Sequence, residues 1–318
     1  MPTRSRLSRR ALLQSCGALA ASGLGSRTVA QQGRPPSATS HRRLSFGSQE
    51  LVVLSDGHMV VPTRMLAGNV PQAELTSFLA SQGVGPHRVL FHLNVALVKT
   101  GNAYVLIDAG AGGTWEATAG RLADSLAAAG VKPDEIGTVV LSHAHPDHIW
   151  GLIDELDNSL RFPQAQYLVS AREFEFWTRA EATSFNGPIE GIAAGAKRVF
   201  KAIEERTTRI RPGAEILPGI VAIDSAGHTP GHISLLLTSG SKRLLITADA
   251  VQNNHIALAH PDWQPVADMD SAKAAQSRRQ VLELAATDRL EVLCYHLPFP
   301  GLGRVERKGS AFAWIAAT

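Results

Sequence analysis

The stretch Ser142-His143-Ala144-His145-Pro146-Asp147-His148 places four potential metal ligands within six positions, directly after an apolar, strand-like segment, Thr138–Leu141. In extended backbone, residues i and i+2 project to the same side, so His143 and His145 can bind one ion together. Pro146 has a fixed φ and disfavours helical geometry in the residue before it. The chain can therefore turn there and direct the two ligands that follow at a second ion.

The types of side chain in this stretch narrow the choice of metal. Imidazole and carboxylate groups suit zinc, and they also accept manganese, iron or cobalt. We therefore predict two divalent metal ions, with Zn²⁺ as the first choice. A histidine cluster on the surface, or a single residue capping a helix, is the alternative, and only the rest of the chain can decide between them.

Three further apolar segments are each followed by a candidate ligand: Ile220–Ser225 with His228, Leu244–Ala248 with Asp249, and Val292–Tyr295 with His296. The first leads into Gly227-His228-Thr229-Pro230-Gly231-His232, where glycine lets the backbone approach a site closely and His228 can complete a set of three histidines. Open α/β sheets place their sites at the carboxyl ends of strands. The four segments therefore predict one shared site.

These four motifs, in this order, resemble the metallo-β-lactamase superfamily, and the resemblance extends from about Leu51 to the C-terminus. It implies an α/β fold of the αββα sandwich type, with two mixed sheets flanked by helices and a dinuclear site at one edge. The implied ligands are His143, His145 and His228 for the first metal, Asp147, His148 and His296 for the second, and Asp249 as a bridge between them.

Asp249 also bears on the subgroup, because true β-lactamases have no bridging aspartate at the matching point. The chain is more similar to the methyl parathion hydrolase group and related lactonases, as the runs Ser55-Asp56-Gly57 and Ile107-Asp108-Ala109-Gly110 indicate. It departs from their pattern at Ala109, where threonine is common, and at Trp150, where glycine is usual.

The resemblance implies a hydrolase in which two metals share a water and supply hydroxide at neutral pH. Asp249 and Asp147 are the predicted catalytic residues, the first fixing the metal separation and the second taking up a proton. The expected substrates are small apolar esters, lactones or organophosphate triesters. An acyl homoserine lactonase is one alternative, and a metal-binding protein or sensor without catalysis is another.

Six more residues are expected around the ligands. Three tryptophans are candidate walls of the substrate pocket, although aromatic side chains are more often core: Trp115, Trp150 and Trp177. Three polar residues are candidate supports that orient the ligands from behind, with turn formation as the alternative for the two aspartates: Asp56, Asp108 and His232.

The N-terminus carries the basic charge of the chain. The whole sequence has a net charge of +3, but residues 1–30 contain five arginines and no acidic residue, so the remainder has 26 basic and 28 acidic residues. Ser8-Arg9-Arg10 followed by a short apolar stretch and Thr28-Val29-Ala30 is typical of a twin-arginine (Tat) signal peptide. A disordered basic tail is the alternative.

We therefore predict a signal peptide at 1–30, a flexible linker at 31–48 and a catalytic domain at 49–318, in a periplasmic or secreted protein. The expected partner is a small-molecule substrate, with no nucleic acid, no stable membrane span and a possible homodimer. Beyond the signal, Cys294 is the single cysteine, and we interpret it as a small buried apolar residue rather than a ligand.

Local patterns also predict particular elements. Val95–Lys99 and Tyr104–Ile107 indicate a hairpin that turns through Thr100-Gly101-Asn102. Helices are predicted over Leu122–Ala129, which Gly130 ends, and over about Ser271–Ala286, with Asp270 or Ser271 as its cap.

Overall fold

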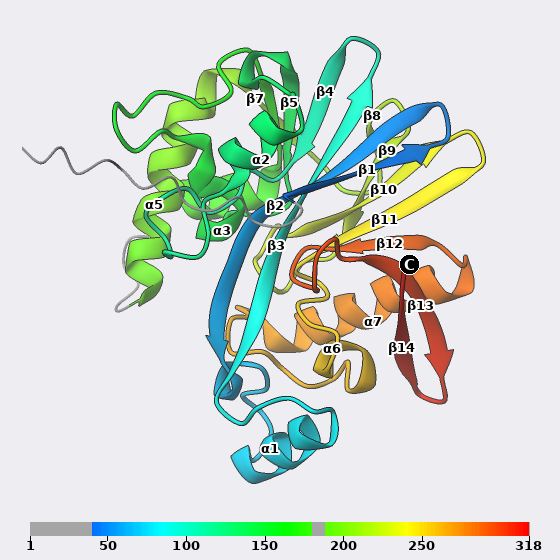
Figure 1. The fold of residues 1–318 in the computed structure, drawn as a ribbon. Coiled ribbons are helices and arrows are strands. Elements are labelled where there is room, and N and C mark those ends of the chain that lie inside the picture. The colour runs from blue at the N-terminus through cyan, green and yellow to red at the C-terminus, as the bar shows by residue number, and fades with distance from the viewer. Residues whose placement is uncertain (1–39, 180–187, 318) are drawn as a thin grey trace, which may run out of the picture. The chain divides into compact units, whose positions relative to one another are not determined.

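The first of two seven-stranded sheets follows the chain in sequence order (Figure 1). Its strands are β1 (His41–Phe46), β2 (Gln49–Pro62), β3 (Arg88–Thr100), β4 (Ala103–Ile107), β5 (Ile136–Leu141), β6 (Gln166–Ser170) and β7 (Thr207–Ile210). Strands β1 to β4 pair antiparallel and β4 to β7 pair parallel, so the sheet is mixed.

The second sheet is also mixed and has the order β14-β13-β12-β11-β10-β9-β8. Its strands are β8 (Glu215–Leu217), β9 (Ile220–Asp224), β10 (Ile233–Ser239), β11 (Lys242–Ala248), β12 (Glu291–Cys294), β13 (Leu302–Lys308) and β14 (Ala311–Ala316). Strands β11 and β12 pair parallel, and all other neighbours pair antiparallel.

Helices cover the outer faces of both sheets, except that α1 packs at the far end of the β2–β3 hairpin. They are α1 (Gln72–Ser81), α2 (Leu122–Ala128), α3 (Pro146–Ile149), α4 (Ala171–Thr178), α5 (Pro188–Ile203), α6 (Ile256–Ala259) and α7 (Ser271–Thr287). Single 3₁₀ turns lie at Thr63–Met65, Pro133–Glu135, Trp150–Leu152 and Glu204–Arg206. In Figure 1 the helices α2, α3 and α5 lie beside the first sheet, and α7 lies beside the second.

Three apolar layers hold this arrangement together. A central layer contains side chains from the inner faces of both sheets, such as Val53, Val140, Leu235 and Ile246. One outer layer joins the first sheet to α2, α4 and α5, and the other joins the second sheet to α7. Alternate residues of a strand face opposite sides, so each sheet contributes to two layers. The predicted αββα sandwich is confirmed.

This computed structural model describes residues 40–179 and 188–317, which belong to one unit, Thr39–Thr318. The predicted signal peptide and the first half of the predicted linker, residues 31–39, lie outside the described residues. The linker prediction was wrong at its C-terminal end, because residues 41–46 form β1 and pair with β2 from His41–Leu54 to Phe46–Gln49. In a flexible tether, the backbone N–H and C=O groups are hydrogen-bonded to water. In residues 41–46 they pair instead with β2, which follows directly in the chain.

The predicted local elements are confirmed with small shifts in their bounds. The hairpin is β3 and β4, with Thr100 opposite Ala103. The second predicted helix is α7, and Asp270 caps it by accepting a hydrogen bond from the backbone N–H of Lys273 at 3.0 Å. Cys294 is fully buried in the layer between the second sheet and α7, as its interpretation requires.

No helix among the described residues is both long and apolar enough to span a bilayer. The possible homodimer stays a prediction.

Two glycines of α5 test how tightly this helix packs in the outer layer beside the first sheet. Gly191 has open space around it, so Gly191→Ala should stabilise the protein by about 0.5–1 kcal/mol through helix propensity. A Cβ at Gly195 would overlap the indole of Trp150, so Gly195→Ala should destabilise it by about 1–3 kcal/mol. Urea unfolding of both variants measures the difference, and equal effects would contradict the packing described.

Candidate metal centre

The carboxyl ends of four strands bring the candidate ligands to one edge of the sandwich. His143 follows β5 in the first sheet. His228, Asp249 and His296 follow β9, β11 and β12 in the second sheet, and these three strands run in the same direction because β9 and β11 both pair antiparallel with β10. The loops after them therefore meet at the same edge.

The proline of the first motif begins a short helix, as its restricted geometry predicts. His145 is extended, with φ −70° and ψ 154°, and Pro146 is the first residue of α3. Asp147 and His148 lie in the first turn of that helix, and their ligand atoms group with those of His296 rather than with the His143–His145 pair. One loop thus contributes to two separate groups of ligand atoms.

The seven candidate ligands form two groups. Within each group, the ligand atoms lie within 4.8 Å of one another: His143, His145, His228 and Asp249 in the first, and Asp147, His148 and His296 in the second. In the first group, the Nδ1 atom of His145 lies 2.8 Å from the Nε2 atom of His228. Two ring nitrogens this close must share a proton or a cation.

Asp249 lies between the two groups. Its Oδ2 atom is 3.3 Å from Nε2 of His228, in the first group, and 3.1 Å from Nε2 of His296, in the second. Its Oδ1 atom is 3.1 Å from Nε2 of His148, also in the second group. The carboxylate of Asp249 can therefore contact ions held by either group.

Several polar atoms that face this centre lack hydrogen-bond partners, as expected of atoms that bind metal ions. Four buried atoms have no hydrogen-bond partner among the described residues: His143 Nε2, Asp147 Oδ2, His148 Nε2 and Asp249 Oδ1. A buried polar group without a partner costs about 1–3 kcal/mol, and natural structures contain few of them. Nitrogen and carboxylate oxygen are ligands that zinc and similar divalent cations accept. The residues present fit a pair of such ions.

Three of the five imidazole rings are hydrogen-bonded through Nδ1, so that their Nε2 atoms face the centre. The Nδ1–H of His148 donates to Asp108 at 2.8 Å, that of His228 to Asp268 at 2.9 Å, and that of His296 to the carbonyl of His92 at 2.9 Å. Carboxylates and carbonyls only accept, so the proton must lie on Nδ1. Such bonds set the tautomer that a metal ligand needs.

Buried charges set the protonation of the centre. Burial lowers the pKa of His143 well below its usual range, and the neighbouring His148 lowers it further. Burial also lowers the pKa of His148, but the carboxylates of Asp249, Asp147 and Asp108 outweigh it and raise that pKa well above its usual range. A divalent cation would supply the positive charge that these carboxylates attract.

The three predicted supports have different roles. Asp108 accepts hydrogen bonds from His148 and from the backbone and hydroxyl of Ser142, each at 2.8 Å. His232 does not join either ligand group; its Nε2 accepts the backbone N–H of Asp249 at 3.1 Å. Asp56 contacts no imidazole within the described residues. It accepts the N–H groups of Ala111 and Leu122, both at 2.7 Å, and so holds two loops together.

Sequence reasoning missed the support behind His228. Asp268 is buried, and its other oxygen, Oδ2, accepts from Arg278 at 2.8 Å. Arg278 comes from α7 and also donates to the carbonyls of Ala250 and Pro261. Neither residue lies in a motif, and a charged residue on a helix usually faces water, so no signal in the sequence marked them.

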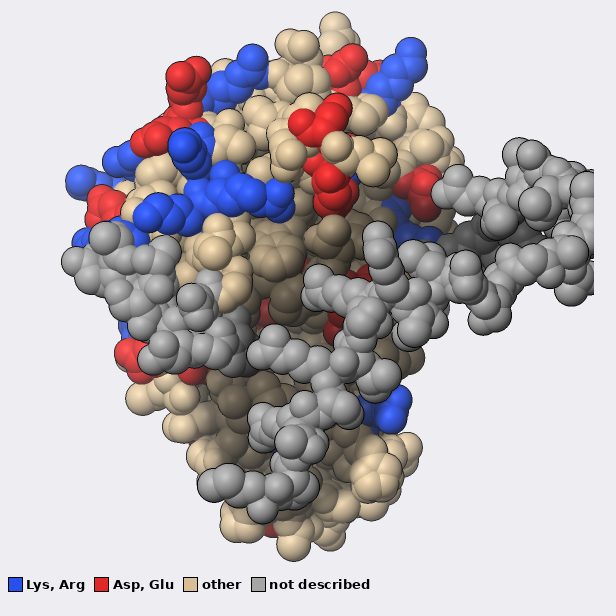
Figure 2. All heavy atoms as spheres, turned by 90° about the vertical axis from the view of Figure 1, so that its left-hand side faces the viewer, with Lys and Arg blue, Asp and Glu red and all other residues tan. Residues whose placement is uncertain are grey.

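A cavity of about 760 Å³ opens onto the centre, and its wall is largely apolar. The long hairpin of β2 and β3 forms one side, with Met59, Met65 and Phe91 among the lining residues. Figure 2 shows basic and acidic side chains side by side on the upper part of the face in view. The cavity therefore suits an apolar ligand whose reactive group lies at the metal centre.

Two of the three predicted tryptophans line this cavity. Trp115 is partly buried there, and Trp177 is almost completely buried beside His145, with ring centroids 6.2 Å apart. Trp150 is absent from the lining formed by the described residues. It lies behind Trp115 in an edge-to-face contact of 5.3 Å, so the prediction that it forms the pocket wall was wrong.

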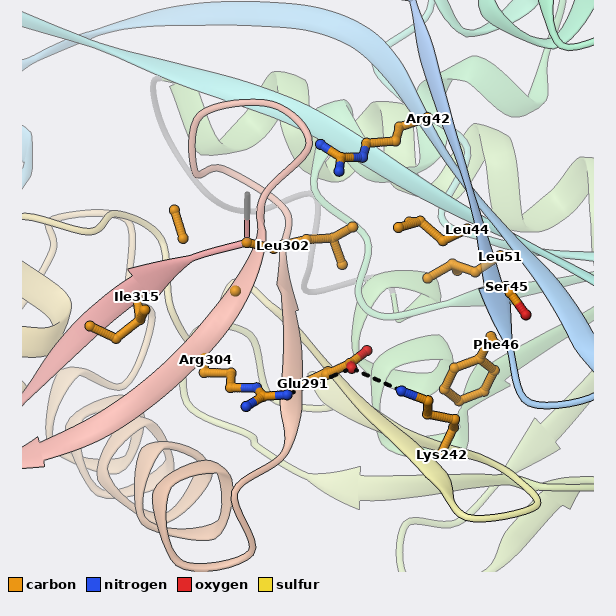
Figure 3. Close-up of a pocket in the computed structure, with 13 residues that line it drawn as sticks. Arg42, Leu44, Ser45, Phe46, Leu51, Lys242, Glu291, Leu302, Arg304 and Ile315 are labelled. Atoms are coloured by element: carbon orange, nitrogen blue, oxygen red, sulfur yellow. Dashed lines mark ion pairs between the residues drawn. The ribbon is translucent and has the colours of Figure 1, made fainter.

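A second cavity, of about 510 Å³, lies between β1 and β2 on one side and β11 to β14 on the other (Figure 3). None of the seven candidate ligands lines it. Two of its basic residues face Glu291, with Lys242 at 3.6 Å and Arg304 at 4.0 Å, so their charge is partly neutralised. The chemistry of the protein therefore belongs to the first cavity.

Comparison with protein families agrees with this geometry. The family described as "Metallo-beta-lactamase superfamily" matches residues 88–296, which span the β3 strand to the last candidate ligand. The chain belongs to this superfamily. A similar known structure is that of AidC, described as a dizinc quorum-quenching lactonase in complex with a product, which is 31% identical with a TM-score of 0.83. The match covers 88% of this chain and 98% of AidC.

Other known proteins are similar at lower identity. The hydrolase AbOPH is 25% identical with a TM-score of 0.80, over 88% of this chain and 98% of that one. An N-acyl homoserine lactonase from Bacillus sp is 25% identical over 177 residues, which is 55% of this chain and 62% of the relative. The chain thus spans less than two thirds of the length of the first curated relatives it matches. Membership of the superfamily is shown by the family match, and the methyl parathion hydrolase subgroup stays a prediction.

Asp108 and Asp56 form a matched pair for testing the support behind the ligands. Both are buried aspartates that accept backbone N–H groups, but only Asp108 contacts a candidate ligand. We expect Asp108→Asn to lower zinc affinity by about 10–100-fold, because an amide has a single accepting oxygen and cannot accept from both the backbone N–H of Ser142 and the Nδ1–H of His148. Chelator competition measures this, and Asp56→Asn is the control. An equal loss in both variants would argue against a role in ligand orientation.

Proposed function

We propose that this protein is a dinuclear-metal lactonase that hydrolyses N-acyl homoserine lactones or similar lactones with an apolar chain. The observation that carries the proposal is the position of the metal centre at the floor of an apolar cavity. The similarity to AidC over 88% of the chain supports it.

The residues that would hold the two ions are those grouped by the structure. His143, His145 and His228 would bind the first ion, Asp147, His148 and His296 the second, and Asp249 both. Held by these residues, two divalent cations would supply a water activated at neutral pH and a positive charge for the carbonyl oxygen of the substrate.

The side chains of the chain position the substrate and move the proton. Asp147 lines the cavity, and its Oδ2 atom lies 3.4 Å from Nε2 of both His148 and His296. We assign Asp147 the proton that leaves the attacking water and is returned to the alkoxide of the opened ring. Tyr295 holds this residue in place, because its hydroxyl donates to the backbone carbonyl of Asp147 at 2.7 Å and its ring stacks on His148.

Residues of β2 and β3, the 3₁₀ turn after β2 and the loop after β4 would contact the apolar part of the substrate. Met59 in β2 and Met65 in the turn have flexible side chains, whereas Phe91 in β3 and Trp115 in the loop are large and rigid. Burial of each methylene group contributes about 0.8 kcal/mol at most, so an acyl chain gains affinity with each carbon that the cavity covers. An ester or a phosphotriester with an apolar group would meet the same wall, which makes the lactone ring the feature to test.

Loss of the bridging carboxylate tests the dinuclear centre. We expect Asp249→Ala to lose about 1,000-fold in turnover of N-hexanoyl homoserine lactone, which corresponds to the several kcal/mol that two ions contribute. Metal-free protein should be equally inactive, and added zinc should restore wild-type protein alone. A pH indicator follows the acid released, with p-nitrophenyl acetate and paraoxon as comparison substrates. Full activity without metal would overturn the proposal, and faster turnover of paraoxon would favour a phosphotriesterase.

Acyl-chain preference tests the role of the cavity wall. Met65 lines the cavity, whereas Leu90 on the same hairpin is 53% exposed and lies outside the lining. We expect Met65→Ala to raise KM for a dodecanoyl lactone by about fivefold, equivalent to about 1 kcal/mol of lost apolar contact, and to leave the butanoyl lactone nearly unchanged. Leu90→Ala is the control. The same change for both chain lengths would show that Met65 does not contact the acyl chain.

We also propose that the protein is exported by the Tat route, supported by Ser8-Arg9-Arg10 and the apolar stretch after it. In a bacterial host, replacing both arginines by lysine should keep the precursor in the cytoplasm. Cell fractionation with an antibody against the catalytic domain measures this, and unchanged export would contradict the proposal.

A further inference from the structure

Glu173 in α4 is a buried acidic residue that belongs to neither ligand group and to none of the sequence motifs. Its exposed fraction is 0%. Burying a carboxylate costs several kcal/mol unless hydrogen bonds replace the lost water. Glu173 therefore requires a specific set of partners, and these partners show what it does.

Four donors surround the carboxylate, two on each oxygen. The Oε1 atom accepts the backbone N–H of Ala144 at 2.9 Å and the indole N–H of Trp177 at 2.7 Å. The Oε2 atom accepts the hydroxyl of Thr229 and the backbone N–H of Gly231, both at 2.8 Å. Three of these donors are N–H groups that cannot accept a hydrogen bond, so the ionised carboxylate satisfies all four.

The donors belong to the two loops that carry the first ligand group. Ala144 lies between His143 and His145, in the loop after β5 of the first sheet. Thr229 and Gly231 follow His228 in the loop after β9 of the second sheet. One oxygen of Glu173 thus holds one loop, and the other oxygen holds the other loop.

We propose that Glu173 is a positioning residue that joins the two ligand loops and so sets the geometry of the first metal ion. This inference rests on the metal centre described under the proposed function, but it does not depend on which substrate the centre cleaves. The carboxylate fixes the backbone on either side of the place where His145 Nδ1 and His228 Nε2 approach to 2.8 Å.

The close approach of the loops explains a glycine in the second motif. A Cβ at Gly231 would overlap the backbone of Glu173, so a larger residue would push the loop away from the carboxylate. A single further backbone bond joins the same loops, from the N–H of Ile233 to the carbonyl of Ser142 at 3.0 Å. Among the described residues, the two loops are therefore connected mainly through Glu173, by its bonds to Ala144, Thr229 and Gly231.

The effect should be specific to the first ion. Glu173 contacts neither Asp147, His148 nor His296 in the part of the chain that the structure describes. Loss of a residue that orients ligands typically lowers metal affinity by about 10–100-fold. Loss of the carboxylate should therefore lower the affinity for the first ion to this extent and leave the affinity for the second nearly unchanged. A general loss of stability would instead lower the affinity for both ions.

Glu173→Gln is the direct test, because the amide keeps the shape of the side chain but its nitrogen cannot accept the N–H of Gly231 or Ala144. Zinc affinity is measured by chelator competition for both ions. In a His296→Ala background, which removes a ligand from the second group only, the bound zinc reports the first site. We expect a 10–100-fold loss there, and wild-type affinity for both ions in Glu173→Gln would overturn the proposal.

Tyr167→Phe is the matched control. The Tyr167 hydroxyl is also buried, beside the first sheet, and donates to the carbonyl of Phe162 at 2.9 Å, and this bond involves neither ligand loop. It should lower stability in urea and leave zinc affinity unchanged. If Tyr167→Phe lowers the affinity for the first ion as much as Glu173→Gln does, Glu173 has a structural role only.

Thr229→Val provides a second variant in case Glu173→Gln does not fold. It removes one of the four hydrogen bonds and keeps the volume of the side chain, so we expect a smaller loss of about 3–10-fold for the first ion. In a double-mutant cycle, the effect of Thr229→Val should vanish once Glu173 is glutamine. Unchanged zinc affinity in Thr229→Val would contradict the proposal. Failure of wild-type protein to cleave lactones, with both ions bound, would reject the proposed function and leave this inference intact.

Discussion

The structure depends on the burial of five imidazoles and two carboxylates against one another at one edge of the sandwich. These groups cannot satisfy each other by hydrogen bonds alone, as four buried ligand atoms without partners show. Divalent cations resolve this conflict, because they replace protons between ring nitrogens and neutralise the carboxylates. Every ligand must then lie within the short radius of an ion, which requires loops from both sheets to meet at one place. The central apolar layer between the sheets makes that meeting possible.

The protein meets this requirement with an outer ring of supports. Asp108 and Asp268 each hold the proton of one imidazole on the nitrogen that faces away from the centre, and His232 holds the backbone of Asp249. Glu173 joins the two loops of the first ligand group. Because these supports come from a strand end, two loops and a helix, the whole sandwich determines the geometry of the centre. The long β2–β3 hairpin contributes to both parts of the site: the carbonyl of His92 in β3 accepts the Nδ1–H of His296, and other residues of the hairpin line the apolar wall.

Local chemistry explains which sequence predictions held. The hairpin of β3 and β4 and the cap of α7 by Asp270 depend on neighbours a few residues away, and both patterns predicted them. The errors arise where a distant partner decides the outcome. The sequence of residues 41–46 is typical of a tether, but these residues pair with β2. Trp150 was expected in the pocket wall, but its ring packs against Gly195 of α5, which has no side chain to exclude it. Asp56 resembles a support of the ligands but holds the loops at Ala111 and Leu122 instead.

The sequence by itself determined the sandwich, the superfamily and the seven residues that the structure gathers into two groups, because strand ends and ligand spacing are written into short motifs. Only the tertiary structure decided which residues orient those ligands and what the cavity is made of. Glu173, Asp268 and Arg278 carry no motif, and their roles come from burial beside loops far away in the chain. A charged side chain becomes a support only when the fold removes it from water and surrounds it with donors or acceptors, and no local pattern records that event.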